Sequence, residues 1–299
     1  MTVENHTAYV RRLVEQGGPR EPEYGEFDAW TIRINDAVRH GQISSVELAS
    51  LRSSFGEVLT PATLAGFAFT KPHGYAGDYE IIDRIYRNHI SRDPRFTHWD
   101  RHWQTRPATQ AVRNRKTYFH KILDRHYERR SPLRILKVAT GPGRSMYEWL
   151  SANPNASVTF DCIEIDPAAI RYASDLNEPF QDRITFIQKN ALRYRPNAKY
   201  DLIWAAGIFD YFNDRVFVSL LQRLLPAIEP NGELVIGNFA DNNPGRAYME
   251  LFDWVLNHRS ANDLVAFALE CGVARERITT GSEPEGVNLF LHVAGKSGR

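Results

Sequence analysis

Two glycines in a turn are the residues of this sequence best suited to bind a charged ligand. The run VATGPGRSMYEWL sets Thr140, Gly141 and Gly143 between an expected strand and an expected helix. Such a turn brings backbone N–H groups and the positive end of a helix dipole to one point, which suits a carboxylate or a phosphate. Met146 stands where a dinucleotide-binding fingerprint has its third glycine, so a pyrophosphate is disfavoured. A purely structural turn is the alternative.

An acidic side chain ends the next expected strand. The run DCIEIDPAAI contains Glu164, Ile165 and Asp166. A carboxylate at the end of a second parallel strand can accept hydrogen bonds from both hydroxyls of a ribose, and Glu164 is the first choice for this contact. Ile165 is expected to bind the same ligand. Asp166 directly precedes Pro167, so it fits a helix N-cap.

The ends of two further strands supply a polar residue and a loop of small residues. Asn190 and Ala191 follow ITFIQ, where an adenine ring would lie, and Asn190 either contacts that ring or makes a turn. The run YDLIWAAG ends in the small residues Ala205, Ala206 and Gly207, which leave room for a reacting centre. Asp210 and Tyr211 follow it and can assist a hydroxyl or amine acceptor by removing a proton, with a helix cap as the alternative role for Asp210. A carboxylate acceptor needs no base.

The spacing of apolar residues changes near residue 130. Before it, apolar residues recur three and four apart, as in helices. After it, short β-rich runs alternate with helices, which predicts a parallel sheet covered on both faces. We therefore expect an all-helical region over 1–130 and an α/β domain over 131–299. The β-rich runs are RILKVA, SVTFDCIEI, ITFIQ, YDLIWAA, GELVIGNF and VNLFLHVAG.

The composition argues against several classes of partner. The 37 Lys and Arg residues nearly balance the 36 Asp and Glu residues, so we expect no nucleic-acid partner. No apolar run has the length of a signal peptide or a membrane span, so we expect a cytoplasmic protein without membrane insertion. His98 and His102 lie one helical turn apart without an accompanying carboxylate motif, so no metal is assigned.

In this order, the glycine turn, the ribose acid, the polar residue and the small-residue loop resemble the signature of class I S-adenosylmethionine-dependent methyltransferases. The resemblance covers residues 130–299 and implies a Rossmann-like, seven-stranded sheet whose last strand is antiparallel. It implies S-adenosyl-L-methionine as cofactor, S-adenosyl-L-homocysteine as product and a small-molecule substrate. The run VNLFLHVAG suits the antiparallel strand. The helical region would then form an N-terminal cap.

Other stretches resemble a narrower group, the bacterial methyltransferases that make 3-hydroxy fatty acid methyl ester signals (extracellular factor). This resemblance implies methyl transfer to a carboxylate or hydroxyl oxygen of a lipid-like or secondary metabolite. An N- or C-methyltransferase of a natural-product pathway, a nicotinamide-dependent oxidoreductase and a non-enzymatic sensor or scaffold stay open. The stretches are KPHGYAGDYEIID, ATQAVRNRKTYF, AAGIFDYFNDR, GNFADNNPGRAYMELFDWVLNHRS and GVNLFL.

The first two of these stretches suggest ligand contacts from the N-terminal half. HGYAGDYE is typical of a loop that ends at a helix N-terminus and closes over a cofactor, with His73 as a base, Tyr75 at the substrate and Tyr79 at the cofactor. Arg113 and Arg115 are alternatives for the methionine carboxylate, because a guanidinium offers a bidentate fork. We include Arg113 among the residues that are expected to bind the cofactor.

The stretch after the fifth expected strand suggests a substrate lid. It contains Asn238, Arg246 and Trp254 near the edge where a substrate must enter. Trp254 also fits a packing role, as apolar residues on helices often do. The helical half either shapes the substrate pocket or mediates a homodimer.

Overall fold

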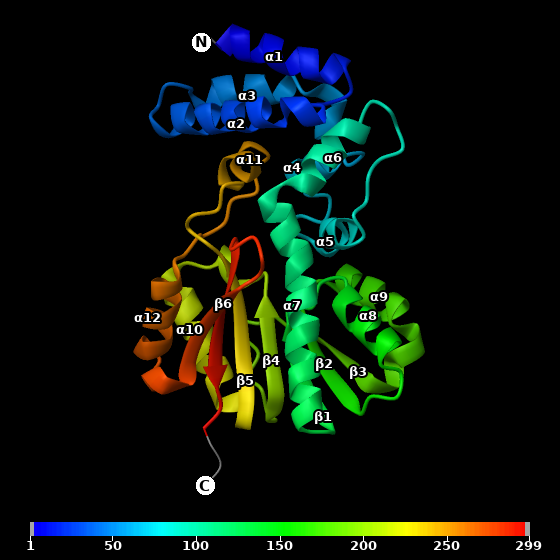
Figure 1. Ribbon diagram of the computed structural model, residues 1–299, viewed down its shortest axis with the longest axis vertical. Coiled ribbons are helices and arrows are strands. Elements are labelled where there is room, and N and C mark those ends of the chain that lie inside the picture. Colours follow the sequence, from blue (N-terminus) through cyan, green and yellow to red (C-terminus); the bar gives the residue numbers. More distant parts are fainter. Residues whose placement is uncertain (1–2, 297–299) are drawn as a thin grey trace. The chain divides into compact units, whose positions relative to one another are not determined.

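The computed structural model describes residues 3–296 and contains two compact units (Figure 1). The helical unit comprises residues 1–110 and 244–255, and the sheet unit comprises 111–243 and 256–299. The first boundary between the two units follows residue 110 and falls inside helix α7 (Pro107–Arg129), which continues through this position without interruption. The expected boundary near residue 130, at the end of the same helix, stays a prediction.

The helical unit is built of helices, as the apolar spacing before residue 130 predicted. The first strand of the described chain begins only at Leu133, as expected. Side-chain caps start several of the helices, for example Ser44, which forms a capping box with Glu47, and Asp78, which accepts from two backbone N–H groups. Besides the short 3-10 helices η1 (Glu21–Glu23) and η2 (Gly56–Leu59), the elements are α1 (Val3–Glu15), α2 (Tyr24–Arg39), α3 (Ser45–Ser53), α4 (Leu64–Thr70), α5 (Tyr79–Tyr86), α6 (Thr97–Thr105) and α11 (Arg246–Leu251).

An aromatic core holds the helical unit together. Phe27 stacks on Trp30 with ring centroids 5.6 Å apart, and Phe55 meets Trp99 edge to face at 5.7 Å. Helix α11 returns from late in the sequence to pack on α2, as the orange and blue ribbons of Figure 1 show. Glu250 of α11 accepts hydrogen bonds from side chains of α2. These long-range contacts explain why residues 244–255 belong to this unit.

The sheet unit has the predicted seven-stranded sheet, in the order β3-β2-β1-β4-β5-β7-β6. Strands β1 to β5 are parallel, and β7 is antiparallel to both of its neighbours. One edge strand was missing from the predicted runs, because its sequence ITTGS lacks an apolar alternation. The strands are β1 (Leu133–Val138), β2 (Val158–Glu164), β3 (Ile184–Gln188), β4 (Tyr200–Ala206), β5 (Ile228–Phe239), β6 (Ile278–Ser282) and β7 (Asn288–Ala294).

Two apolar clusters cover the faces of this sheet. One joins α7 and α8 to β1, β2 and β4, and the other joins α10 and α12 to the opposite face. Figure 1 shows α9 beside β2 and β3, and α12 beside β6 and β7. The helices are α8 (Arg144–Ala152), α9 (Pro167–Leu176), α10 (Asp214–Leu224) and α12 (Ala261–Glu270), and the short 3-10 helices are η3 (Glu178–Arg183), η4 (Phe209–Tyr211), η5 (Leu225–Ala227) and η6 (Arg275–Arg277).

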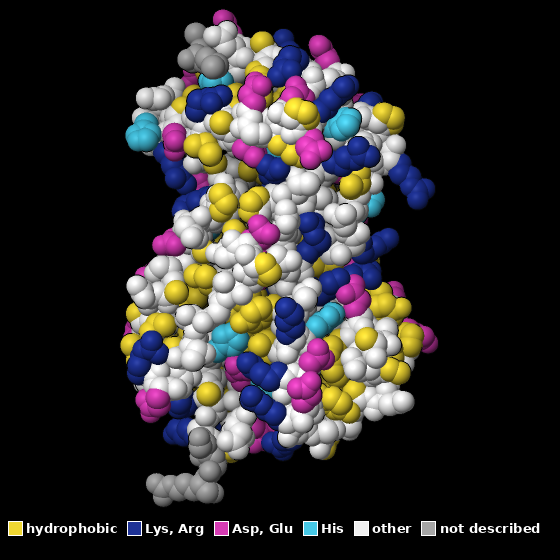
Figure 2. All heavy atoms as spheres, in the orientation of Figure 1, with side chains coloured by type: hydrophobic (Ala, Val, Ile, Leu, Met, Phe, Trp, Pro, Cys, Tyr) yellow, Lys and Arg dark blue, Asp and Glu magenta, His cyan; other side chains and the backbone are white. Residues whose placement is uncertain are grey.

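The surface agrees with the balanced composition. Lys and Arg side chains alternate with Asp and Glu side chains over the face that Figure 2 shows. Among the described residues, every helix is too short or too polar to cross a bilayer.

Candidate functional site

The glycine turn lies between β1 and α8, at the carboxyl edge of the sheet. Gly141 and Gly143 both have positive φ, of 61° and 71°. A Cβ atom at Gly141 would meet nothing within 4 Å, whereas one at Gly143 would lie 2.8 Å from Asn177 and 3.0 Å from Ala173 of α9. Gly141 therefore leaves open space above the turn, and Gly143 allows α8 and α9 to pack closely.

Glu164 lies directly beside this turn. Its Oε2 accepts a 3.0 Å hydrogen bond from the Gly141 N–H, and its Oε1 accepts bonds from the N–H groups of Ile165 and Asp166. Glu164 is 8% exposed, whereas the neighbouring Ile165 is 59% exposed. Asp166 caps α9 by accepting from Ala168, which confirms its predicted role. The glycine turn and the Glu164 carboxylate thus lie together, and the apolar side chain of Ile165 lies next to them.

The end of β3 has a turn built by Asn190. Its Oδ1 accepts a 2.8 Å hydrogen bond from the Leu192 N–H, so its side chain makes a local turn. Ala191 is 8% exposed and belongs to the apolar cluster that joins α10 and α12 to the sheet. In the structure Asn190 makes a local turn, which is one of its two expected roles. The expected contacts of Asn190 and Ala191 with an adenine ring stay predictions.

The loop after β4 lies against an arginine of α7. Half-buried Ala206 ends the strand, and Gly207 follows with φ of 100°. A Cβ atom at Gly207 would lie 2.7 Å from the Nη1 atom of Arg115, so the glycine lets the guanidinium lie directly against the backbone. Arg115 is 5% exposed, whereas Arg113 is half-buried. Arg115 is therefore the residue of this pair that lies at the end of β4.

Asp210 is a buried carboxylate in the same loop. Its Oδ1 accepts a 2.6 Å hydrogen bond from the Phe239 N–H at the end of β5. Burial raises the pKa of Asp210 to about 6, although that hydrogen bond and the charges of Arg115 and Arg259 lower it. The cap of α10 is Asn213, so the helix-cap alternative for Asp210 is wrong. Tyr211 is 38% exposed.

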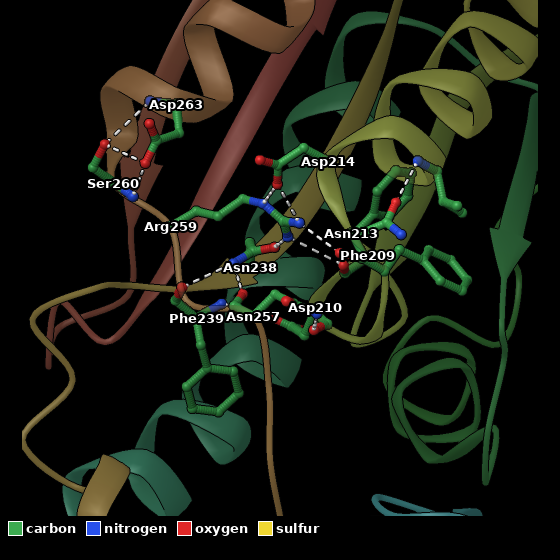
Figure 3. A network of polar contacts seen from close by, with 12 residues as sticks. Phe209, Asp210, Asn213, Asp214, Asn238, Phe239, Asn257, Arg259, Ser260 and Asp263 are labelled. Carbon is green, nitrogen blue, oxygen red and sulfur yellow. Dashed lines mark hydrogen bonds and ion pairs between the residues drawn. The ribbon is translucent and has the colours of Figure 1, made fainter. Parts of the chain in front are cut away.

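Arg259 connects this loop to the end of β5 (Figure 3). Its guanidinium donates to the Asn238 Oδ1 at 2.8 Å and pairs with Asp214 at 2.9 Å. It also donates to the carbonyl oxygens of Phe209 and Phe212. Asn238 in turn donates to the Asn257 carbonyl at 3.0 Å and is fully buried. Asn238 is thus an internal link of this network, and its expected contact with a substrate stays a prediction.

Five predicted residues belong to the helical unit. His73 contacts Glu80 at 3.1 Å, and its ring lies 4.5 Å from that of buried Tyr79. Tyr75 is 39% exposed. His73 and Tyr75 lie in the loop that leads into α5, and Tyr79 is the first residue of that helix.

The other two belong to the 244–255 segment. Arg246 pairs with Glu250 at 2.7 Å along α11. Trp254 is 5% exposed and stacks on Trp103 at 6.4 Å, so its packing role is observed.

Sequence reasoning missed Lys137, which lies beside the glycine turn. Lys137 of β1 is 4% exposed, and its Nζ donates a 2.8 Å hydrogen bond to the Oγ of Ser145 in α8. Thr140, which the sequence analysis placed in the turn, is also buried, and its N–H donates to the Ile163 carbonyl. A single lysine within the apolar run ILKVA is the signal that could have revealed the buried cation.

The fold and the sequence comparisons define the class of the sheet unit. Residues 135–232 match the family model of a methyltransferase domain. Together with the sheet order, this match identifies an S-adenosylmethionine-dependent methyltransferase domain. S-adenosylmethionine is therefore the cofactor of this class.

Individual relatives are distant. Malonyl-acyl-carrier-protein O-methyltransferase 1 of Ilyobacter polytropus is 27% identical over 118 residues, which are 39% of this chain and 40% of that protein. The chain thus spans about two fifths of the length of this curated relative.

Two crystal structures are similar in fold. A possible exported protein from Bordetella parapertussis has a TM-score of 0.62 at 16% identity, covering 99% of this chain and 98% of the other. Magnesium protoporphyrin IX methyltransferase from Synechocystis PCC 6803, with bound S-adenosylhomocysteine, has a TM-score of 0.50 at 12% identity, covering 63% and 87%. At these identities the likeness is one of fold.

Proposed function

We propose that the protein transfers the methyl group of S-adenosylmethionine to a carboxylate or hydroxyl oxygen of a small lipid-like or secondary metabolite. The observation that carries the proposal is the hydrogen bond between Glu164 and the Gly141 N–H, because it joins the ribose acid to the glycine turn. The name of the Ilyobacter relative, an O-methyltransferase, supports oxygen as the acceptor atom. The resemblance to the 3-hydroxy fatty acid methyl ester group supports a lipid-like acceptor.

The residues at this edge fit the cofactor. Gly141 faces open space, and exposed Ile165 offers an apolar surface beside the Glu164 carboxylate. We assign the ribose hydroxyls to Glu164 and the adenine to Ile165 and Ala191. When bound, the cofactor supplies an electrophilic methyl group on a sulfonium. The other proposed cofactor contacts are Tyr79, Arg113, Thr140, Gly143, Asn190 and Ala206.

The protein contributes mainly by positioning the reactants and excluding water. A carboxylate acceptor needs no proton removal, whereas a hydroxyl acceptor does. Asp210 suits the second case, because a carboxyl group with a pKa of about 6 is largely ionised near neutral pH and can accept a proton. His73 and Tyr211 are the alternative bases.

The proposed acceptor contacts are Tyr75, Asn238, Arg246 and Trp254. Tyr75 has the exposure that a contact residue needs, whereas Trp254 is buried against Trp103. The helical unit forms part of the acceptor site in this proposal, and a homodimer through the same unit is the alternative.

The first test is calorimetric titration with S-adenosylhomocysteine and, separately, with NADH. We expect S-adenosylhomocysteine to bind and Glu164→Gln to weaken it at least about tenfold, because the variant loses a charged acceptor. Glu178→Gln is the matched control, since Glu178 is exposed in η3. Binding of NADH alone would return the glycine turn to a dinucleotide function.

The second test identifies the acceptor atom. The protein is incubated with methyl-labelled S-adenosylmethionine and separate panels of hydroxy fatty acids, acyl-carrier-protein thioesters with a free carboxylate, and amines. We expect label in a fatty-acid product, and mild alkali should release it as methanol if the product is an ester. Alkali-stable label indicates a hydroxyl acceptor, and label in the amines alone rejects oxygen.

A further inference from the structure

Strand β6 is an edge strand whose outer side has no neighbouring strand in the described part of the chain. The N–H of Glu283 donates to the Asn288 carbonyl oxygen, so these residues form a hydrogen-bonded pair of the antiparallel ladder between β6 and β7. Because such pairs alternate, the backbone groups of Thr279 and Gly281 face β7, and those of Thr280 face away. Among the described residues, none bonds the backbone N–H or the backbone carbonyl of Thr280. The outer edge of β6 therefore offers a free donor and a free acceptor at its middle residue.

The sheet unit covers the two faces of β6 but leaves this edge accessible. Helix α12 lies beside the strand (Figure 1), and Ile278 belongs to the same apolar cluster as Leu264 of that helix. On the other face, a Cβ atom at Gly281 would lie 2.5 Å from the Tyr118 hydroxyl of α7. Thr280 is nevertheless exposed. Unpaired backbone groups on an edge strand are a ready template for a strand of another chain.

The segment around Thr280 is complementary to itself. An antiparallel pair of two copies brings the start of one β6 strand beside the end of the other. Positions 275 and 285 are equally far from Thr280, so exposed Arg275 of one copy comes beside exposed Glu285 of the other. The second arginine of η6 offsets its single glutamate, so the start of the strand stays positive. Arg275 now donates to the Ile278 carbonyl oxygen at 2.9 Å, and this carbonyl also faces outwards.

The opposite edge of the sheet is less suited to the same contact. It is formed by β3, whose middle residue is Phe186. In an antiparallel pair centred there, Arg183 would lie opposite Lys189 of the second copy, and like charges that face each other are destabilising. β6 is therefore the edge that favours a second copy.

We propose that two copies of this chain pair through β6 in antiparallel orientation, centred on Thr280, so that their two sheets become one continuous sheet. Such a contact is two-fold symmetric and self-complementary, as a closed dimer requires. The pair gains backbone hydrogen bonds at Thr280 and between Ile278 and Ser282, and the charges of Arg275 and Glu285 favour this register. Because a strand of five residues makes a small interface, we expect a dissociation constant on the order of 10 μM. The inference concerns the sheet unit alone and does not depend on the proposed function.

Sedimentation equilibrium of the full chain tests the dimer. Between about 1 and 200 μM, the weight-average mass should rise from that of one chain towards that of two. Thr280→Lys should raise the dissociation constant at least about tenfold, because two lysines would face each other at the symmetry axis. Thr280→Val is the matched control, since it keeps the backbone groups and a β-branched side chain and should dimerise like the unchanged protein.

A charge exchange tests the orientation of the two strands. Arg275→Glu and Glu285→Arg should each weaken the dimer about twofold to fivefold, because each variant places like charges at both ends of the pair. The double variant should recover the affinity of the unchanged protein, since opposite charges then meet again. The replaced side chains are exposed, so we expect each variant to fold, which circular dichroism checks.

Cysteine cross-linking tests the register. In a Cys271→Ser background, Thr280→Cys should form a disulfide-linked dimer on mild oxidation, because directly opposed Cα atoms lie about 5.5 Å apart. Ser282→Cys should not, because the two copies of this position lie more than about 10 Å apart.

A protein that stays monomeric throughout this concentration range overturns the inference. So does a dimer that Thr280→Lys leaves intact, or one that Ser282→Cys links as readily as Thr280→Cys, because its contact lies elsewhere. Assemblies larger than two chains also overturn it, since they indicate pairing between unlike edges. If Thr280→Lys does not fold, the charge exchange decides, and a double variant that fails to recover the affinity overturns the proposed pairing.

Discussion

The Arg259 guanidinium donates a 2.8 Å hydrogen bond to the side-chain oxygen of Asn238, and both residues are almost fully buried. This bond joins the segment after residue 255 to the end of β5. The same guanidinium holds the carbonyl groups of Phe209 and Phe212 on either side of Asp210. Arg259 therefore fixes the loop that carries two proposed bases.

Replacing Arg259 should destabilise the sheet unit much more than replacing its ion-pair partner. Arg259→Met removes a donor from the Asn238 Oδ1 and from the Phe209 and Phe212 carbonyls, of which only the Phe209 carbonyl keeps another donor, the Phe212 N–H. We therefore expect the free energy of unfolding to fall by about 2–4 kcal/mol. Asp214→Asn should cost less than about 1 kcal/mol, because exposed ion pairs contribute little and the Asp214 side chain is 71% exposed. Denaturant unfolding of both variants measures the difference. Equal losses would mean that the ion pair, and not the loop contacts, carries the effect.

Asp210→Asn should stabilise the protein at neutral pH but not in acid. The raised pKa of the folded state means that ionisation of Asp210 opposes folding. The protonated carboxyl group of Asp210 stabilises the fold fully below the pKa of Asp210 in the unfolded chain. This stabilisation is lost as pH rises towards about 6. The Asn variant keeps an acceptor for the Phe239 N–H, so we expect it to gain about 2–3 kcal/mol near pH 7 and nothing near pH 4.

The same variant separates the two acceptor types. If the acceptor is a hydroxyl and Asp210 removes its proton, turnover should fall at least about a hundredfold although stability rises. If the acceptor is a carboxylate, turnover should change little. A variant that is less stable than the unchanged protein at neutral pH would contradict the burial argument for Asp210.

The sequence predicted the sheet but not every strand. Runs such as YDLIWAA are apolar because β4 is buried on both faces, and their alternation with helices indicates a parallel sheet. The edge strand β6 has no such run, since edge strands are stabilised by pairing and not by burial on both faces. Residues 244–255 pack with the helical unit through Glu250, Asn35 and Arg39, which are distant in sequence and leave no periodic signal.

The site was predicted in part. The glycine turn and Glu164 were found because each follows a strand end, where ligand residues of parallel sheets gather. Lys137 was missed because it lies inside a strand, where the pattern indicates core. The role of Arg115 depends on Gly207, which is far from it in sequence and meets it only in the folded chain.

Gly207→Ala should impair both folding and cofactor binding. Alanine would have to adopt φ of 100°, and its Cβ atom would lie 2.7 Å from the Nη1 atom of Arg115. We expect a cost of about 1–3 kcal/mol, mainly from backbone strain, and a shift of the Arg115 guanidinium. Displacement of Arg115 should also weaken binding of S-adenosylhomocysteine. Gly272→Ala is the control, since Gly272 has φ of 76° but open space around its Cβ position. It should cost about 1–2 kcal/mol and leave binding unchanged. If the two variants lost the same stability and the same affinity for S-adenosylhomocysteine, the contact with Arg115 would not explain the effect of Gly207→Ala.

Glu233→Gln should destabilise the sheet unit in a pH-dependent way. Glu233 is 14% exposed and accepts from His126 at 2.8 Å and His292 at 2.7 Å, with Arg125 also paired to it. Although burial raises its pKa, the two histidines and Arg125 hold that pKa well below its usual range.

A carboxylate with a lowered pKa stabilises the fold above the pKa of the unfolded chain, and this contribution is lost as pH falls. We therefore expect Glu233→Gln to cost about 3–5 kcal/mol near pH 7 and clearly less near pH 2, because the contribution is lost progressively as pH falls from the pKa of the unfolded chain towards that of the folded one. Glu276→Gln, at an exposed position, should have no measurable effect. Thermal or urea unfolding across this range measures the difference. A cost that stays constant with pH would show that hydrogen-bond geometry, and not charge, makes Glu233 stabilising.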